Sequence, residues 1–300
     1  MKPAYLKLAD SGQLETRAAS AWRHLQDCDL CARYCHINRL RTLKGAVCRT
    51  GERAVVYSHG PHHGEEDALR GRNGSGTIFF SWCNLRCVYC QNWDISQKGV
   101  GREIGPAGLA AMMLELQAMG CHNINFVTPS HVVAQIIAAV EIAAGKGLRL
   151  PLVYNTGGYD SPEALHLLDG IIDIYMPDMK YGSSAQAHQF SHVRNYAEVN
   201  RAAIREMHRQ VGDLVTDEDG IALQGLLVRH LVLPENIAET RTVLEFLVEE
   251  ISADTCLNLM DQYRPCYRAD ENPPLDGAIT SREFAQARSW ATQLGLHRFA

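Results

Sequence analysis

The most informative stretch of this sequence is residues 77–92, which read TIFFSWCNLRCVYCQN. It begins as an apolar strand and continues into a loop that carries Cys83, Cys87 and Cys90 in the spacing C-x3-C-x2-C. Three thiolates on one loop can each bind an iron at a corner of a [4Fe–4S] cube, a cluster that four cysteines normally hold. The fourth iron then has no nearby protein ligand. A zinc knuckle is the alternative, although zinc sites usually use C-x2-C pairs and a fourth ligand.

Downstream of this stretch, apolar strands alternate with helical segments. We predict strands, each followed by a helix, at residues 77–80, 123–127, 152–154, 171–175, 226–233 and 256–260. Strand–helix units in series are typical of the α/β class, with a parallel sheet and crossover helices. An open sheet and a curved, partial barrel both fit this pattern. In either case ligands belong at the carboxyl ends of the strands, which is where the cysteine loop lies.

Other segments carry weaker local signals. We expect a lead-in helix within residues 1–25, a connecting loop over 58–76 and a polar helical region from about 185 to 210. The loop includes Glu65 and Glu66, which we interpret as solvated rather than as part of a metal site. Two helix starts resemble capping boxes, one with Asn236 and Glu239 and one with Thr280 and Glu283.

A second group of cysteines precedes the first predicted strand. Four thiols with one C-x2-C pair are enough for structural zinc or for a second iron–sulfur cluster, and both remain open. His36 can replace one of the four ligands. This module consists of Cys28, Cys31, Cys35 and Cys48. Of the remaining cysteines, we expect Cys121 and Cys256 to be buried in the core.

The composition restricts the setting in which the protein works. The chain of 300 residues has 29 basic and 34 acidic side chains and a net charge of −5, with no Lys/Arg block that would indicate nucleic-acid or membrane binding. No apolar run approaches the roughly 18 residues of a membrane span, and the start lacks the pattern of a secretory signal. We therefore expect a cytoplasmic protein, in which ten cysteines favour metal binding over disulfides.

The motif with an aromatic residue between its second and third cysteines resembles that of radical S-adenosylmethionine enzymes. More narrowly, the string from Trp82 to Asn92 resembles that of the pyruvate formate-lyase activating enzyme group. The resemblance implies a partial (β/α)6 barrel over residues 71–300. Residues 1–70 then form an N-terminal helix, the cysteine-rich module and a connecting loop.

The resemblance also implies a chemistry. S-adenosylmethionine chelates the open iron, the reduced cluster passes an electron to the sulfonium, and a 5′-deoxyadenosyl radical forms and abstracts hydrogen from a substrate. An electron donor such as flavodoxin or ferredoxin is implied, and in an activating enzyme the substrate is a partner protein that acquires a glycyl radical. Two alternatives stay open. One is a radical enzyme that modifies another protein, a peptide or a small molecule, and the other is a non-enzymatic iron–sulfur or zinc electron carrier or scaffold.

Several residues match positions that matter in this family. Tyr89 stands where the family contacts adenine, and Asn155 stands in a turn where the family usually has Asp for cofactor binding. Asp178 and Lys180 resemble an Asp-x-Lys pair that reaches the cofactor or substrate. Arg229 lies in a strand that ends in proline, and we expect it to face the cavity, whereas the adjacent His230 fits a core histidine.

The clearest departure from the family follows the second strand. Many radical enzymes have Gly-Gly-Glu there to hold the methionyl amine, but this chain has residues 127–131, VTPSH. We expect Thr128 and Ser130 to hold that amine instead, although Ser130 also fits a helix cap. His131 is a candidate proton carrier, because histidine changes charge near neutral pH.

Overall fold

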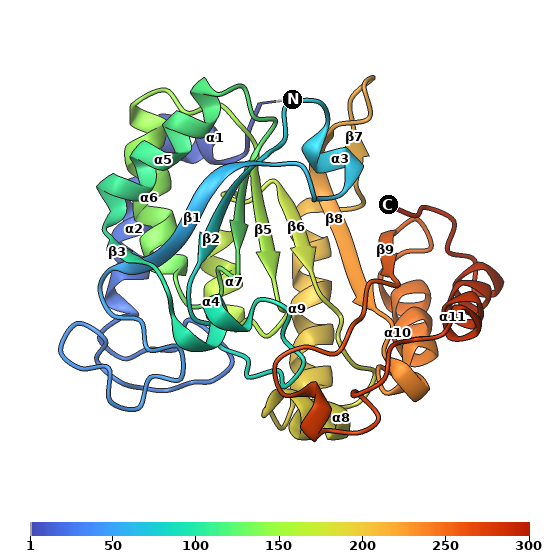
Figure 1. The fold of residues 1–300 in the computed structure, drawn as a ribbon. Coiled ribbons are helices and arrows are strands. Elements are labelled where there is room, and N and C mark those ends of the chain that lie inside the picture. Colours follow the sequence, from blue (N-terminus) through green and yellow to red (C-terminus); the bar gives the residue numbers. More distant parts are fainter. Residues whose placement is uncertain (1) are drawn as a thin grey trace.

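Six parallel strands form the centre of the computed structural model, which describes residues 2–300. In spatial order they are β2 (Ser75–Phe80), β4 (Ile124–Val127), β5 (Leu152–Thr156), β6 (Ile174–Pro177), β8 (Ala222–Leu231) and β9 (Cys256–Met260). Among the described residues β2 and β9 do not pair, so the sheet is curved but not closed (Figure 1). The predicted α/β fold with a mostly parallel sheet is confirmed.

Three antiparallel strands extend this sheet. They are β1 (Ala54–His62) and β3 (Arg102–Ile104) on the β2 side, and β7 (Val215–Thr216) beside β8. β1 occupies part of the stretch that we expected to be a loop, and that expectation was wrong. Its Gly, His and Pro residues are unfavourable for a strand, but pairing with both β2 and β3 supplies the backbone hydrogen bonds.

The helices pack around the outside of the sheet (Figure 1). The main ones are α5 (Pro106–Ala118), α6 (Val133–Gly145), α7 (Pro162–Leu168), α9 (Tyr196–Val211), α10 (Thr240–Phe246) and α11 (Ser281–Gln293). The capping box of Thr280 and Glu283 is confirmed at the start of α11. The other capping box is wrong, because Glu239 has a left-handed backbone and Asn236 Oδ1 instead accepts a hydrogen bond from the Thr240 amide at 3.1 Å.

Two predicted helical regions are each divided by a residue with positive φ. The lead-in region forms α1 (Tyr5–Asp10) and α2 (Gln13–Arg23), separated by Gly12 with φ of 72°. The polar region forms α8 (Ser184–Ser191) and α9, separated by His192 with φ of 55°. No helix among residues 2–300 is both long enough and apolar enough to cross a membrane.

The N-terminal helices are part of the core. α1 and α2 cover α6, most of whose residues are fully buried. The backbone amide of Ala4 donates to Asp173 Oδ1 at 2.7 Å, and the other oxygen of that carboxylate accepts from the Leu152 amide at 2.8 Å. The start of the chain is thereby hydrogen-bonded to the beginning of β5 and β6.

The inner face of the sheet is filled at one end only. Short α3 (Asp67–Arg70) lies where the parallel strands begin, and its Leu69 packs against inward-facing residues such as Val153 and Ile174 (Figure 1). The loops of residues 24–53 lie at the opposite end, beside α4 (Trp93–Lys98) (Figure 1). Polar side chains therefore occupy the interior toward the carboxyl ends of the strands.

Gly225 is the glycine on which the central sheet depends most. Its φ is 126°, and a Cβ there would lie 2.4 Å from both the Asp213 carbonyl oxygen and Leu214 Cα. We expect Gly225→Ala to lower the free energy of unfolding by about 3 kcal/mol or more, because backbone strain and steric overlap add. Gly147→Ala, with φ of 97° and nothing within 4 Å, should cost only about 1 kcal/mol. Denaturant unfolding measures the free energy of unfolding of both variants. Equal losses of stability would show that steric overlap at Gly225 does not add to the backbone strain.

Candidate functional site

The cysteine loop (residues 81–92) leaves the carboxyl end of β2 and is fixed by backbone hydrogen bonds. The amides of Arg86 and Val88 donate to the carbonyls of Ser191 and Phe190 at 3.2 and 2.8 Å. Trp82 has a left-handed backbone, and its indole occupies the space above Gly99, where a Cβ would lie 2.1 Å from the ring. The loop is therefore held by several distant segments of the chain before any ligand is considered.

Each of the three thiols of the loop has a hydrogen-bond partner in the protein. Ser191 Oγ donates to Cys87 Sγ at 2.9 Å, the Leu85 amide donates to Cys83 Sγ at 3.3 Å, and Cys90 Sγ lies 3.1 Å from Ser96 Oγ. Burial, and after it the nearby Cys87, raises the pKa of Cys83 to about 12. The three thiols are thus within electrostatic reach of one another.

Some of the predicted site residues line one cleft of about 220 Å³. Tyr89, Asp178, Lys180 and Arg229 line it together with two of the loop cysteines, Cys87 and Cys90. The ring of Tyr89 is buried edge-on against Tyr181 and Tyr263, with centroid distances of 6.4 and 6.1 Å. The exposed rim consists of Gln91, Asn92 and Gln262.

Asp178 is the centre of the charge network in this cleft. Its Oδ1 accepts from Arg229 Nε at 3.0 Å and its Oδ2 from Lys180 Nζ at 2.6 Å. Burial opposes ionisation of Asp178, but the two cations outweigh it and lower the pKa of the carboxyl below its usual value. Burial likewise disfavours the charged forms of Lys180 and Arg229, yet Asp178 raises the pKa of each. All three groups are therefore ionised at neutral pH.

Asn155 belongs to the same network, although it does not line the cleft. Its Oδ1 accepts from Arg229 Nη2 at 2.7 Å, so β5, β6 and β8 are connected through side chains. The following turn brings Gly158 against Asp178, and a Cβ there would lie 2.4 Å from the Asp178 carbonyl oxygen. His230 is buried and contacts the Met179 carbonyl and Thr240 Oγ1, as expected for a core histidine.

Two of the residues after β4 for which we predicted roles, Ser130 and His131, are buried. His131 is buried behind the cysteine loop, where its Nε2 lies 3.0 Å from the Ser81 carbonyl oxygen, and burial lowers its pKa to about 3. A neutral imidazole fixed in this way positions the loop and is poorly placed to carry protons. Ser130 neither caps α6 nor has a free hydroxyl, because its Oγ lies 2.9 Å from Thr156 Oγ1. Thr128 is partly exposed and has a φ of 62°. Its role in binding the methionyl amine remains a prediction.

Sequence reasoning missed an acidic pair that reaches the interior of the sheet. Glu66 Oε1 accepts from Asn258 Nδ2 of β9 at 2.8 Å, while its buried Oε2 has no partner. Asn125 of β4 is fully buried, and neither polar atom of its side chain has a partner. Burial, and to a smaller extent Glu66, raises the pKa of Glu65 to about 7 against the opposing effect of Arg229. The sequence did contain one signal, Asn125, because a polar residue inside an apolar strand needs a hydrogen-bond partner in the interior.

The N-terminal module packs directly on the cysteine loop. Arg33 Nε donates to the Asn84 carbonyl at 2.7 Å, and Arg86 donates to the Val47 carbonyl. Cys28, Cys31 and Cys48 are buried, whereas His36 is exposed and pairs with Asp27. No three His, Cys, Asp or Glu side chains among residues 2–300 are arranged to hold a metal ion, in this module or in the cysteine loop.

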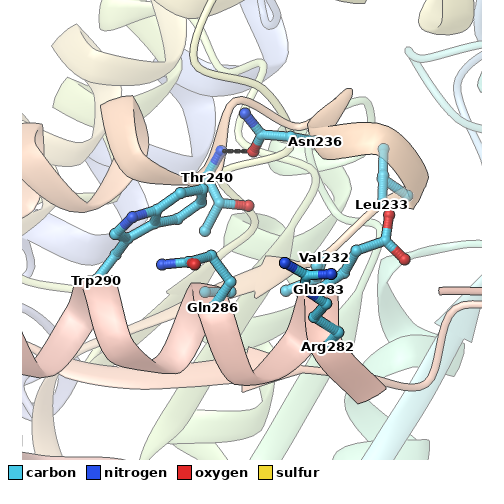
Figure 2. A pocket seen from close by; sticks show the side chains of 9 residues that line it. Val232, Leu233, Asn236, Thr240, Arg282, Glu283, Gln286 and Trp290 are labelled. Carbon is cyan, nitrogen blue, oxygen red and sulfur yellow. Dashed lines mark hydrogen bonds between the residues drawn. The ribbon is translucent and has the colours of Figure 1, made fainter. Parts of the chain in front are cut away.

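Another cavity, of about 190 Å³, lies between α10 and α11 (Figure 2). Trp290, Gln286 and Arg282 project into it from α11, opposite Thr240 and Asn236. It shares no lining residue with the cleft, so it is not part of the candidate site.

Comparisons with known proteins agree with this arrangement. The family model of the Radical SAM superfamily matches residues 77–247. The chain is 30% identical over 294 residues to an uncharacterized protein of Methanocaldococcus jannaschii, covering 94% of this chain and 79% of that protein.

Two solved structures are similar in fold. One is a radical SAM methyltransferase from Sphaerobacter thermophilus, with 11% identity, a TM-score of 0.51 and coverage of 75% of this chain and 65% of that one. The other is HydG, a maturase of the [FeFe]-hydrogenase, with 12% identity, a TM-score of 0.50 and coverage of 97% and 64%. The chain thus spans slightly less than two thirds of either structure, and at these identities the likeness concerns the fold alone.

The raised pKa of Glu65 makes the stability of the protein depend on pH. From about pH 4.5, the usual pKa of glutamate, to about pH 7, the unfolded chain releases this proton while the folded chain retains it. Stability therefore falls as pH rises through this window. We expect Glu65→Gln to raise the melting temperature at pH 8 and to lose this advantage as pH falls toward 5. Thermal unfolding tests this, with the exposed Glu52→Gln as a control that should show no such pH dependence.

Proposed function

The chain belongs to the Radical SAM superfamily, and within it we propose that the protein is an activating enzyme that generates a glycyl radical in a partner protein. The observation that carries the proposal is the Trp82–Asn92 string at the edge of a cleft that also contains Asp178 and Lys180. The exposed rim of this cleft leaves room for an extended segment of a partner chain.

The residues of the cysteine loop fit the cofactor that the family implies. Cys83, Cys87 and Cys90 lie together on one loop after β2, and each sulfur has a neighbouring hydrogen-bond donor, as iron–sulfur thiolates commonly do. A cube has separate corners, so its three thiolates need not converge on one point as the ligands of a single ion must. When bound, the [4Fe–4S] cluster and S-adenosylmethionine supply the electron and the radical chemistry of the family.

The side chains of this protein have a supporting part. Asp178 keeps Lys180 and Arg229 in place and offsets one of their two positive charges in the cleft. Lys180 Nζ has further donors for a carboxylate or carbonyl of a bound ligand. Tyr89, Tyr181 and Tyr263 form an apolar wall that limits the access of water.

Further components complete the proposal. Flavodoxin or ferredoxin is the proposed electron donor, because the chemistry of the family needs a one-electron reductant for the cluster. We also propose a second metal centre, zinc or iron–sulfur, at the N-terminal module of Cys28, Cys31, Cys35 and Cys48.

A second candidate function is a radical enzyme that acts on another protein, a peptide or a small polar molecule. The buried Asn125 amide and Glu66 Oε2 without partners favour it, because such atoms are usually satisfied by water or by a ligand. A small polar substrate that reached beyond Arg229 to Asn125 and Glu66 would supply the hydrogen bonds that these side chains lack.

A deuterium-transfer experiment distinguishes these functions. The reconstituted, reduced protein is incubated with S-adenosylmethionine and an extract of cells grown on glycine deuterated at its α-carbon. We expect deuterium in the 5′-deoxyadenosine product when the protein fraction of the extract is supplied, because hydrogen moves from a glycine residue to the cofactor. Mass spectrometry measures the transfer.

The controls give each outcome a meaning. An extract labelled at leucine should transfer no deuterium, and the Cys87→Ala variant should form no product. Transfer from the small-molecule fraction alone would favour the second candidate. A fully loaded protein that forms no 5′-deoxyadenosine at all would leave only an electron carrier or scaffold.

The charge network makes a separate prediction about Asp178. Asp178→Asn removes the only carboxylate that pairs with Lys180 and Arg229 among the described residues, and it leaves two half-buried cations without a counter-charge. We expect at least a tenfold slower formation of 5′-deoxyadenosine with unchanged iron content. Glu218→Gln, on an exposed turn, is the matched control. Wild-type rates for Asp178→Asn would show that the network does not support the reaction.

A further inference from the structure

Arg39 is a buried cation for which the protein offers no carboxylate. Its side chain is almost completely enclosed, with a relative exposure of 3%. Its Nε donates to the Thr50 carbonyl at 2.7 Å and its Nη2 to the His131 carbonyl at 2.8 Å. Within residues 2–300 no acidic side chain forms an ion pair with it. Arginine does not lose its proton in proteins, so this charge is buried at a cost that only an anion nearby can offset.

The groups that most strongly favour the charge of this guanidinium are thiols. Arg39 Nη1 lies 3.5 Å from Cys28 Sγ, and Cys31 and Cys48 also act on its charge. The backbone places these cysteines around it, because the Cys28 amide donates to the Ile37 carbonyl and the Cys28 carbonyl accepts from His36. Three of the four thiols of the module thus lie near a fixed positive charge inside the protein.

We propose that Cys28, Cys31, Cys35 and Cys48 bind a thiophilic metal centre of net negative charge, with Arg39 as its internal counter-ion. Four thiolates around Zn²⁺ or around an iron–sulfur cube leave such a charge, and metal binding deprotonates the thiols as it forms. The buried cation then has a partner. This inference rests on the residues of the module and is independent of the glycyl-radical proposal.

The same guanidinium connects this centre to the S-adenosylmethionine side of the molecule. Its bond to the His131 carbonyl fixes the segment that follows β4, and the His131 ring in turn contacts the Ser81 carbonyl at the start of the cysteine loop. Arg39 is thus a positioning residue between two metal sites. Loading of the N-terminal centre should stabilise the backbone at the end of β2 and β4.

The first experiment removes the family's cluster and asks whether the chain still holds metal. The variant Cys83→Ala/Cys87→Ala/Cys90→Ala is reconstituted without oxygen, either with iron and sulfide or with Zn²⁺, and its metal content is measured by mass spectrometry. We expect about one zinc or about four irons per chain to remain. Zinc retention identifies a structural site, and iron retention with a cluster spectrum identifies an iron–sulfur site. A folded triple variant that retains neither metal would overturn the proposal.

Matched cysteine variants assign the bound metal to the module. Adding Cys28→Ala and Cys31→Ala to the triple variant should remove the metal, whereas adding Cys121→Ala and Cys256→Ala should leave it bound. Circular dichroism verifies that each variant is folded. Retention after loss of Cys28 and Cys31 would also contradict the proposal, because the metal would then be held elsewhere.

The second experiment tests Arg39 itself. In the triple variant, Arg39→Gln should accelerate the transfer of metal to a chelator by about tenfold or more, since the counter-charge is lost, and Arg39→Lys should restore much of the retention. The exposed Arg41→Gln is the control and should behave as the parent. In the otherwise unchanged protein, Arg39→Gln should weaken S-adenosylmethionine binding severalfold. If Arg39→Gln leaves both metal retention and binding at parental values, Arg39 is not the counter-ion.

Discussion

The pairing of the half-buried Asp178 carboxylate with two cations is the interaction on which the site depends. The carboxylate lies between two cations, one from its own segment and one from β8, and Asn155 of β5 completes the set. Neither cation would be stable in this half-enclosed position without it, because the protein interior screens charge weakly. The neighbouring turn contains Gly158, whose missing side chain allows the backbones to approach. Three adjacent strands therefore end at the same place with their polar groups already paired.

The rest of the site is organised around the loop that follows β2. Backbone groups from α8 hold this loop on one side, and on the other Arg33 of the N-terminal module and Arg86 of the loop itself connect the loop to that module. The apolar interior near Leu69 closes the opposite end of the sheet, so polar groups and ligands share only the carboxyl ends of the strands. The sheet with its helices is thus a rigid scaffold, and the loops at the carboxyl ends of the strands contact one another and form the site, as is usual in α/β proteins.

Much of this arrangement could be predicted from the sequence. Short-range patterns such as the apolar strands, the cysteine spacing and the capping box at Thr280 depend on neighbouring residues and were visible directly. What could not be predicted depended on long-range partners. β1 is a strand because β2 and β3 pair with it, and His131 is neutral because it is buried close to the positive charge of Arg39. Glu66 is buried at a place where Asn258 donates a hydrogen bond to it. The placement of polar residues in the interior thus required the three-dimensional structure.

The hydrogen bond between Ala4 and Asp173 has a practical consequence for the design of fragments of this protein. A fragment limited to the family-matched segment would lack both helices that cover α6, leaving an almost wholly apolar helix facing water. It would also expose the beginning of two central strands. We expect such a fragment to aggregate because of this exposed apolar surface. Fusion and domain-swap designs based on this protein should therefore keep roughly the first two dozen residues together with the sheet and its helices.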